Sequence, residues 1–187
     1  MNEFGSLIVL SLVFGVPLLW ALGTFNGLVR LRNHCDESWS NIDTELQRRH
    51  HLIPNLVRTV REYADHERDV LRQVTEAREV AHRPGSGTRE QSQQESELVE
   101  KIERLLMRVE AYPDLKADRH FLELQEELVR TEDRIQHARR IYNANVRDLN
   151  NRIEIFPANL IASAGTFRKR DYFEVASLRV RTVPSVR

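Results

Sequence analysis

Residues 7–25 read LIVLSLVFGVPLLWALGTF, an apolar stretch that decides the architecture of this 187-residue chain. The wider segment 4–29 carries no charged side chain. An α-helix needs about 20 apolar residues to cross roughly 30 Å of hydrocarbon. The stretch therefore predicts a transmembrane helix that attaches the rest of the chain to a bilayer.

A cleaved secretory signal is the alternative interpretation of the same stretch. Leu7–Trp20 has the length of a signal-peptide apolar region, and Ala21-Leu22-Gly23 has the small residues of a cleavage site. Against this, Met1–Ser6 contains no Lys or Arg, and the apolar run continues to Phe25 as an anchor's does. We favour the membrane anchor and keep the signal peptide as the alternative.

The composition of the remaining chain limits its function. About 160 residues follow the apolar stretch, which is enough for one domain with its own core. All 28 Lys and Arg residues and every acidic residue except Glu3 lie there, so its net charge is +1. A neutral domain without a basic stripe gives little support to nucleic-acid binding. The single Cys35 excludes an internal disulfide and a cysteine zinc cluster.

Basic residues at two places bear on the membrane. Arg30 and Arg32 directly follow the apolar stretch, and the positive-inside rule then favours a cytoplasmic domain. The tail from Arg168 onward holds six basic and two acidic residues. If it is cytoplasmic, each basic residue near an anionic surface would contribute about 1 kcal/mol of binding. A merely solvated terminus is the alternative for this tail.

Beyond residue 27, apolar residues recur at spacings of three and four, which is the helical period. Their stripes predict four long helices. The stripe positions, a few of them polar, are Leu28, Leu31, Cys35, Trp39, Ile42 and Leu46; Ile53, Leu56, Val60, Tyr63, Glu67, Val70, Val74 and Ala77; Leu98, Ile102, Leu105 and Val109; and Phe121, Leu124, Leu128, Thr131, Ile135, Ala138, Tyr142, Asn145 and Leu149. Pro54 is expected in the first turn of the second helix, where proline is tolerated. Loops at 82–88 and 112–114 separate the later helices, Asp118 is expected to cap the fourth, and Pro157 to end it.

Four amphipathic helices joined by short connections bury their stripes most simply against one another. The sequence therefore predicts an all-α protein, in which a single N-terminal transmembrane helix precedes an antiparallel four-helix bundle of long helices. The expected domains are 1–27 for the N-terminus and transmembrane helix, 28–157 for the bundle, and 158–187 for an irregular C-terminal tail. No helix breaker follows Gly27, so the transmembrane helix should continue into the first bundle helix.

Several motifs closely resemble those of LemA family proteins, in order and spacing, from about residue 7 to about residue 174. They are FNGLVRLRN (25–33), SWSNID (38–43), RRHHLIPNLV (48–57), RLL (104–106), EAYPDLKA (110–117), FL (121–122), LQ (124–125), TE (131–132), ARR (138–140), YN (142–143), VR (146–147), Asn150 and FP (156–157). The resemblance implies a membrane-anchored helical bundle, and it implies no reaction, cofactor or active-site residue. Thr24 stands where lipoprotein-like relatives have a cysteine, so this chain resembles the transmembrane branch.

Histidines and carboxylates offer two candidate chemistries. The candidate metal ligands are His50 and His51 beside Asp43, with His34 and His66 elsewhere. Adjacent histidines on a helix diverge by about 100°, which argues against a shared ion. The candidate acid–base groups are Asp65, Glu67 and Asp69, and the neighbouring Glu132 and Asp133. Glu-rich helices carry such pairs on their charged outer faces. We therefore predict no catalytic, cofactor-binding or metal-binding residue.

A further group of polar residues lies within or beside the apolar stripes: Asn41, Asp43, Arg48, Arg49, Asn55, Thr131, Asn143, Asn145 and Asn150. Buried amides and charges must find hydrogen-bond partners. One hypothesis is a network that sets the register of the helices, as a seam asparagine does in coiled coils. The other is a patch that docks a partner protein. The first hypothesis is favoured.

These patterns favour a non-enzymatic scaffold or interaction protein at the bacterial inner membrane. It would contact the lipid bilayer through residues 7–25 and protein partners, or a second copy, through the bundle. The alternative is an enzyme or metal-dependent accessory whose site lies near the joint between the first and second predicted helices.

Overall fold

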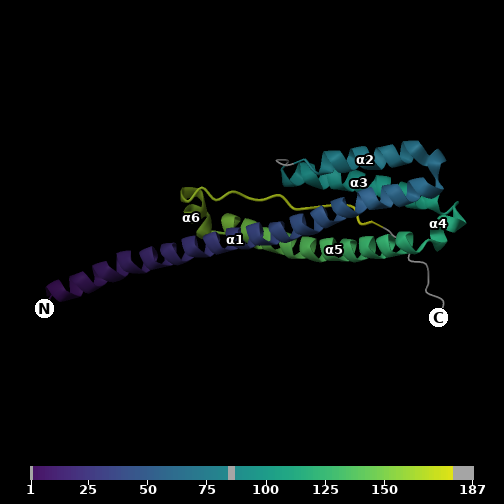
Figure 1. Cartoon of the computed structure of the whole chain (residues 1–187). Helices are drawn as coiled ribbons and strands as arrows, with labels where there is room; N and C mark the ends of the chain where they lie inside the picture. Colours follow the sequence, from purple (N-terminus) through teal and green to yellow (C-terminus); the bar gives the residue numbers. More distant parts are fainter. Residues whose placement is uncertain (1, 84–86, 179–187) are drawn as a thin grey trace. The chain divides into compact units, whose positions relative to one another are not determined.

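The structure, a computed structural model, describes residues 2–83 and 87–178, which form helices and no strand. The elements are α1 (Asn2–Tyr63), the 3₁₀-helix η1 (Asp65–Glu67), α2 (Arg68–Ala81), α3 (Thr88–Val109), α4 (Pro113–Ala117), α5 (Arg119–Glu154) and α6 (Ala158–Ala164) (Figure 1). The expected all-α class is confirmed. The central residues of the 82–88 loop lie outside the described residues.

Helix α1 is continuous from the apolar stretch to Tyr63, as expected from the lack of a breaker after Gly27. By length and composition it is the one described helix that could cross a membrane, with a mean hydropathy of 1.7 in its most apolar window. The expected joint before Ile53 is wrong. The chain instead turns at Ala64, so the second predicted helix is divided among α1, η1 and α2.

Pro54 therefore lies inside a helix and not in a first turn. A proline has no N–H to donate to the carbonyl four residues earlier, which here belongs to His50. The guanidinium of Arg78 on α2 takes that place, and its Nε donates to the His50 carbonyl oxygen at 2.7 Å. A side chain from another helix thus satisfies the backbone group that the proline leaves free.

Replacing Arg78 with methionine is expected to lower the free energy of unfolding by about 1–3 kcal/mol, because the His50 carbonyl loses its partner. Urea unfolding followed by circular dichroism measures this loss, with Arg72→Met on the exposed side of α2 as the control. In a Pro54→Ala background the alanine N–H can donate to the same carbonyl. The Arg78 change should then cost less, and equal costs in the two backgrounds would contradict this explanation.

The chain divides into two compact units. The first comprises Met1–Ser38 and Asn143–Asp171, and the second comprises Trp39–Tyr142 and Tyr172–Arg187. Both α1 and α5 pass from one unit to the other. The domain boundaries expected after residues 27 and 157 stay predictions.

The second unit holds most of the apolar core. Its buried side chains on α1, α3 and α5 belong to the predicted stripes, and include Ile42, Leu46, Ile53, Leu56, Val60, Leu98, Ile102, Leu105, Phe121, Leu128, Ile135 and Tyr142. On α2 the buried face differs from the prediction, because Leu71 is buried with Val74 whereas Val70 and Ala77 are half-buried. Helix α5 begins where expected, because the Phe121 N–H donates to the Asp118 Oδ1 at 2.8 Å and so caps the first turn.

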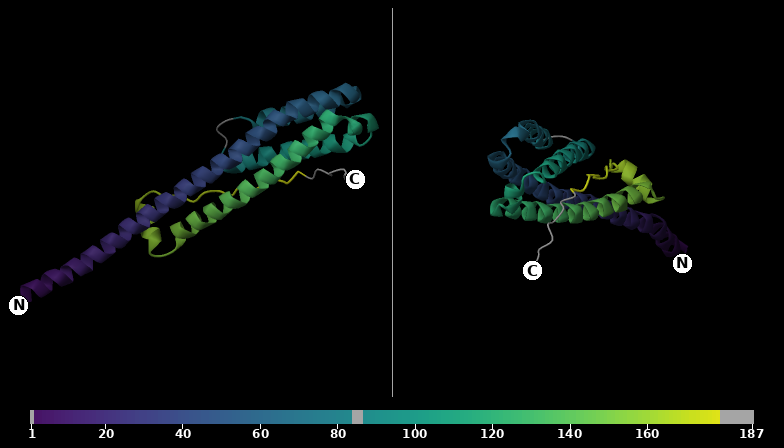
Figure 2. Two further views of the ribbon diagram at one scale, coloured as in Figure 1. Left: turned by 60° about the horizontal axis from the view of Figure 1, so that its bottom comes forward. Right: turned by 90° about the vertical axis from the view of Figure 1, so that its right-hand side faces the viewer.

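In the first unit, the N-terminal part of α1 lies beside the C-terminal end of α5, and the two helices run antiparallel (Figures 1 and 2). The Asn145 side chain of α5 donates to the His34 carbonyl at 3.2 Å and to the Ser38 hydroxyl at 3.1 Å. Asn150 exchanges two hydrogen bonds of 2.9 Å with the backbone of Arg170. These asparagines join α5 to α1 and to the segment after α6, and their role in setting helix register stays a prediction.

The C-terminal tail differs from the expectation of an irregular terminus. Residues Ala158–Ala164 form α6, because the short apolar run after Pro157 packs Ala158 and Ala162 against the first unit. Two basic side chains of the C-terminal tail form ion pairs, Lys169 with Glu154 and Arg170 with Asp36. Arg179 and the later basic residues lie outside the described part of the chain.

Residues 172–178 are neither helix nor strand, yet they pack on the second unit. Phe173, Val175 and Leu178 are buried. The Glu174 N–H donates to the Ser92 hydroxyl at 3.2 Å, and the Ala176 N–H donates to the Ser96 hydroxyl at 3.1 Å. Two serine hydroxyl groups of α3 thus accept hydrogen bonds from backbone N–H groups that, in a β-sheet, would donate to a neighbouring strand.

Candidate functional site

Four ionisable side chains are buried together in the second unit. Arg49 and His50 come from α1, Glu95 from α3 and Glu132 from α5, with exposed fractions of 1%, 2%, 0% and 6%. Each of the three charged residues occupies a stripe position: Arg49 lies between Leu46 and Ile53, and the two glutamates hold equivalent positions on their helices. The helical period therefore turns all three toward the core. We call these four side chains the buried ionic cluster.

The guanidinium of Arg49 bridges the two carboxylates. Its Nη2 donates to the Glu95 Oε2 at 2.5 Å, and its Nη1 donates to the Glu132 Oε2 at 3.1 Å. The second oxygen of Glu95 lies 2.8 Å from the His50 Nε2. One arginine thus links three helices that are far apart in the sequence.

Hydrogen bonds connect the cluster to residues 172–178 of the C-terminal tail. The amide nitrogen of Gln136 donates to the Glu132 Oε1 at 2.9 Å and to the Ser177 hydroxyl at 2.5 Å. Arg139 donates to the Gln136 Oε1 at 2.6 Å and to the Val175 carbonyl at 2.8 Å. The buried charges and the C-terminal segment therefore share one hydrogen-bond network.

The charges of the cluster favour an ionised Glu95. Burial by itself would raise the pKa of this carboxyl, but the hydrogen bond from His50 and the positive charge of Arg49 outweigh it and hold the pKa below its ordinary value. An ionised carboxylate can only accept hydrogen bonds, so the His50 Nε2 carries the proton. The His50 Nδ1 and the Arg49 Nε are buried and have no hydrogen-bond partner within residues 2–83 and 87–178.

A cleft of about 590 Å³ adjoins the cluster. His50 lies in its wall, together with Trp39, Asp43, Gln47, His82 and Gln91. The imidazole rings of His50 and His82 have centroids 5.2 Å apart. The cleft could hold a small polar molecule. The charged atoms of Arg49, Glu95 and Glu132 face one another, however, and none of these three residues lines the cleft.

Most of this chain matches a known protein family. The family model described as LemA family matches residues 38–187, which include the whole buried ionic cluster. This chain belongs to the LemA family. A curated relative, Protein LemA of Metamycoplasma hominis, is 24% identical over 185 residues, which cover 99% of this chain and 82% of that protein. The predicted resemblance is confirmed.

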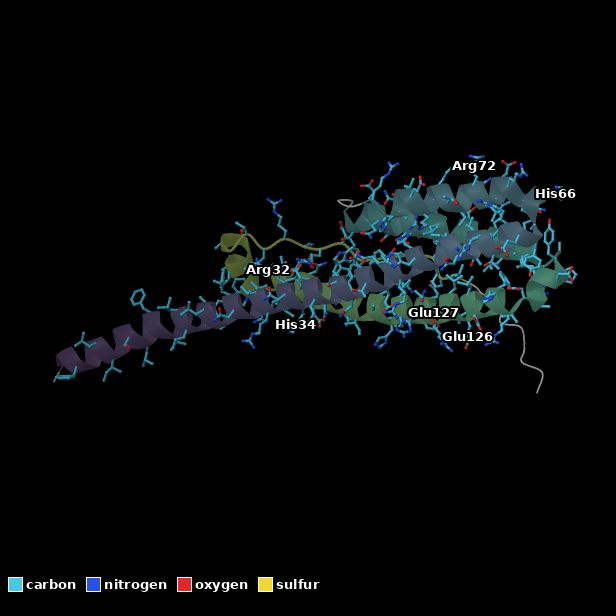
Figure 3. All side chains as sticks on the ribbon, in the orientation of Figure 1. Arg32, His34, His66, Arg72, Glu126 and Glu127 are labelled. Carbon is cyan, nitrogen blue, oxygen red and sulfur yellow. The ribbon has the colours of Figure 1, made fainter. Side chains whose placement is uncertain are left out.

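The histidines that sequence patterns offered as metal ligands do not converge in this LemA protein. His50 is buried and its neighbour His51 is exposed, as their divergence on one helix predicts. His34 on α1 and His66 in η1 project into solvent (Figure 3). Within residues 2–83 and 87–178, no group of three or more His, Cys, Asp or Glu side chains is placed to hold a metal ion.

The structure places the candidate carboxylates in different environments. Glu132 was expected on a charged outer face beside Asp133, and this expectation is wrong for Glu132, which faces the core and pairs with Arg49. Asp133 and Asp69 are exposed. Glu67 is half-buried, and its Oε1 accepts a hydrogen bond of 3.3 Å from the Tyr112 hydroxyl. The side chain of Asp65 lies outside the described part.

The polar residues of the stripes divide into two groups. Arg49 and Thr131 are buried, and Asp43, Asn143, Asn145 and Asn150 are half-buried. Arg48, Asn41 and Asn55 are exposed. Sequence reasoning missed Glu95, although a step of three back from Leu98 along its stripe reaches this residue. A charged residue at a core position was the available signal.

Proposed function

We propose that this LemA-family protein is a single-pass membrane protein whose helical domain organises partner proteins at the bacterial inner membrane without carrying out a reaction. The observation that carries the proposal is the apolar part of α1. A core helix of a soluble protein would be mostly buried, whereas only 11% of the most apolar window of α1 is buried. A helix that exposes apolar side chains in this way needs lipid or another apolar surface around it.

The domain after the anchor is proposed to be an antiparallel four-helix bundle, formed by the second half of α1, α2, α3 and the first half of α5. The buried ionic cluster supports a structural use of its charges, because Arg49, Glu95 and Glu132 neutralise one another and leave the bundle surface for partners. Arg30 and Arg32 at the end of the span support a cytoplasmic domain. Crosslinking in native membranes, followed by mass spectrometry, would identify the partners and their compartment.

Two arginines placed in the span test the anchor. Val13→Arg with Val16→Arg should move the protein from carbonate-washed membranes to the soluble or aggregated fraction, because each arginine near the centre of a span costs about 3 kcal/mol. Met107→Arg with Ile141→Arg is the matched control, since both of these residues are apolar and exposed in the second unit. The control should stay in the membrane fraction.

The same experiment distinguishes the anchor from a cleaved signal. The intact mass of the membrane-bound wild-type protein should include residues 1–23. A mass that begins after Gly23, or equal extraction of the span variant and the control, would overturn the proposed anchor.

An enzyme or metal-dependent accessory is the second candidate. The observation that favours it is the contact of His50 with both the cleft and the Glu95 carboxylate, since a carboxylate can hold an imidazole in one tautomer for proton transfer. The joint between helices at which this site was expected does not exist, because α1 is continuous there. Metal analysis of the purified wild-type chain would separate the metal-dependent form of this candidate from the scaffold.

A further inference from the structure

The turn between α5 and α6 exposes large apolar side chains on the first unit. Ile155, Phe156 and Leu160 are exposed by 58%, 74% and 60%. The surrounding segment, residues 155–167, contains no charged side chain. Isolated apolar residues on a surface are ordinary, but a contiguous uncharged segment with three of them indicates a contact with an apolar partner.

The position of this turn along α1 is set by contacts inside the first unit. The rings of Phe25 and Phe167 lie 5.5 Å apart, edge to face. Helices α1 and α5 run antiparallel here, and Asn145 lies beside His34 and Ser38. Because the two helices rise equally per residue, ten residues onward on α5 correspond to ten residues back on α1. The turn is therefore level with about residue 25, the end of the apolar span.

The burial of side chains on α1 changes at the same level along the helix. Thr24 and Leu28 are buried, whereas Leu19, Trp20 and Leu22 before them are exposed. The other segments of the first unit thus begin to bury α1 side chains where the apolar span ends. The α5–α6 turn lies at this boundary, beside the segment that the proposed function places in lipid.

Basic side chains surround the uncharged segment. Arg30 and Arg32 follow the span on α1, and Arg168 follows the segment itself, all of them exposed. The Arg32 guanidinium carbon lies over the Phe167 ring, 5.6 Å from its centre, so a basic group contacts the uncharged segment directly. Figure 3 labels Arg32 on α1. Apolar and aromatic residues next to arginines are typical of the lipid headgroup region, where long basic side chains reach the phosphates.

We propose that the α5–α6 turn, with Ile155, Phe156 and Leu160, inserts into the interfacial region of the bilayer that α1 crosses, as a second and shallow membrane contact. This inference rests on the proposed anchor. The partner is a lipid surface and not a second protein, because the turn is level with the end of the span and is surrounded by basic residues. The second contact would fix the orientation of the first unit at the membrane.

A fluorescent probe at single cysteines in the full-length protein tests this proposal. Cysteine replaces Phe156 in the turn, Leu19 in the span, or Asp148, which lies roughly 9 Å before the end of α5. Each protein is labelled with an environment-sensitive thiol dye and reconstituted into phosphatidylethanolamine–phosphatidylglycerol vesicles that contain nitroxide-labelled lipid. The native Cys35 should stay unlabelled, because it is buried and burial raises the pKa of its thiol. The labelled wild-type chain measures that background.

The proposal predicts that lipid nitroxides quench most of the fluorescence at positions 19 and 156 and little at position 148. Quenching at 19 without quenching at 156 would overturn the membrane contact of the turn while the anchor stands. Loss of quenching at 19 would instead contradict the proposed function. Equal quenching at all three positions would show that the whole unit lies on lipid, and crosslinking between copies at an unquenched position 156 would assign the turn to self-association. Either result would overturn the inference.

Discussion

Replacing Arg49 with methionine is expected to lower the free energy of unfolding by about 3–5 kcal/mol. The change removes the single guanidinium that bridges Glu95 and Glu132, and both carboxylates are buried. Two carboxylates without their cation must take up protons or draw in water, and either response costs free energy. Methionine keeps an apolar stem of similar length, so the loss reports on the charge and its hydrogen bonds. Urea unfolding of the detergent-solubilised protein, followed by circular dichroism, measures it.

Arg48 offers a matched control for this change. It is the preceding residue of the same helix, it is exposed, and its Nε lies 3.6 Å from the half-buried carboxylate of Glu45, which also pairs with Arg134. Exposed ion pairs contribute about 0–1 kcal/mol, so Arg48→Met should have a small effect. Glu95→Gln in the Arg49→Met background should recover part of the lost stability, because it removes a buried negative charge. Similar losses for Arg48→Met and Arg49→Met would contradict the assigned role of the cluster.

Replacing Phe173 with alanine is expected to lower the free energy of unfolding by about 3–5 kcal/mol, although Phe173 lies in a segment without regular secondary structure. Its ring is fully buried and meets Trp39 of α1 edge to face, with centroids 5.3 Å apart. Truncation removes apolar burial and leaves a cavity beside Trp39, whose ring also contacts Tyr142. The same urea titration measures the loss.

The neighbouring Tyr172 is the control, because it is aromatic but exposed. Tyr172→Ala should change the stability little. Limited proteolysis supplies a second measurement, since release of residues 172–178 from the second unit should make this segment cleavable in the Phe173 variant and leave it protected in the Tyr172 variant. An equal effect of the two substitutions on both measurements would show that the tail does not depend on the buried ring.

The helical segments could be predicted because their evidence is local. Apolar spacing located α3 and α5, and Asp118 marked the start of α5. The loop expected at 112–114 is only partly correct, because α3 ends at Val109 and Pro113 and Asp114 begin the short helix α4, where proline is tolerated in the first turn. The interruption at Pro54 was predicted wrongly for a nonlocal reason. The bond that the proline removes is replaced by Arg78 on another helix, so the local rule for a helix boundary did not apply. The turn at Ala64 was missed because neither glycine nor proline marks it.

The candidate site was predicted in part. Arg49 and Thr131 were recognised as polar residues at core positions, and the divergence of His50 and His51 was anticipated. Glu132 was placed on the wrong face, and Glu95 was not considered. A carboxylate in a stripe indicates burial only if a cation meets it, and that cation lies 46 residues away for Glu95 and 83 residues away for Glu132. No local pattern carries that information.

The sequence by itself determined the uncharged apolar stretch, the helical period and the family, because each depends on the order of residues along one segment of chain. Only the tertiary structure decided which charges are buried together, which carbonyl Arg78 satisfies, and that an irregular tail packs its Phe173 in the core. These outcomes depend on contacts between segments, where the cost of burying a charge or a backbone group is offset by a partner from elsewhere in the chain. For the same reason, the alignment of the α5–α6 turn with the end of the apolar stretch follows from the pairing of α5 with α1 and not from either segment alone.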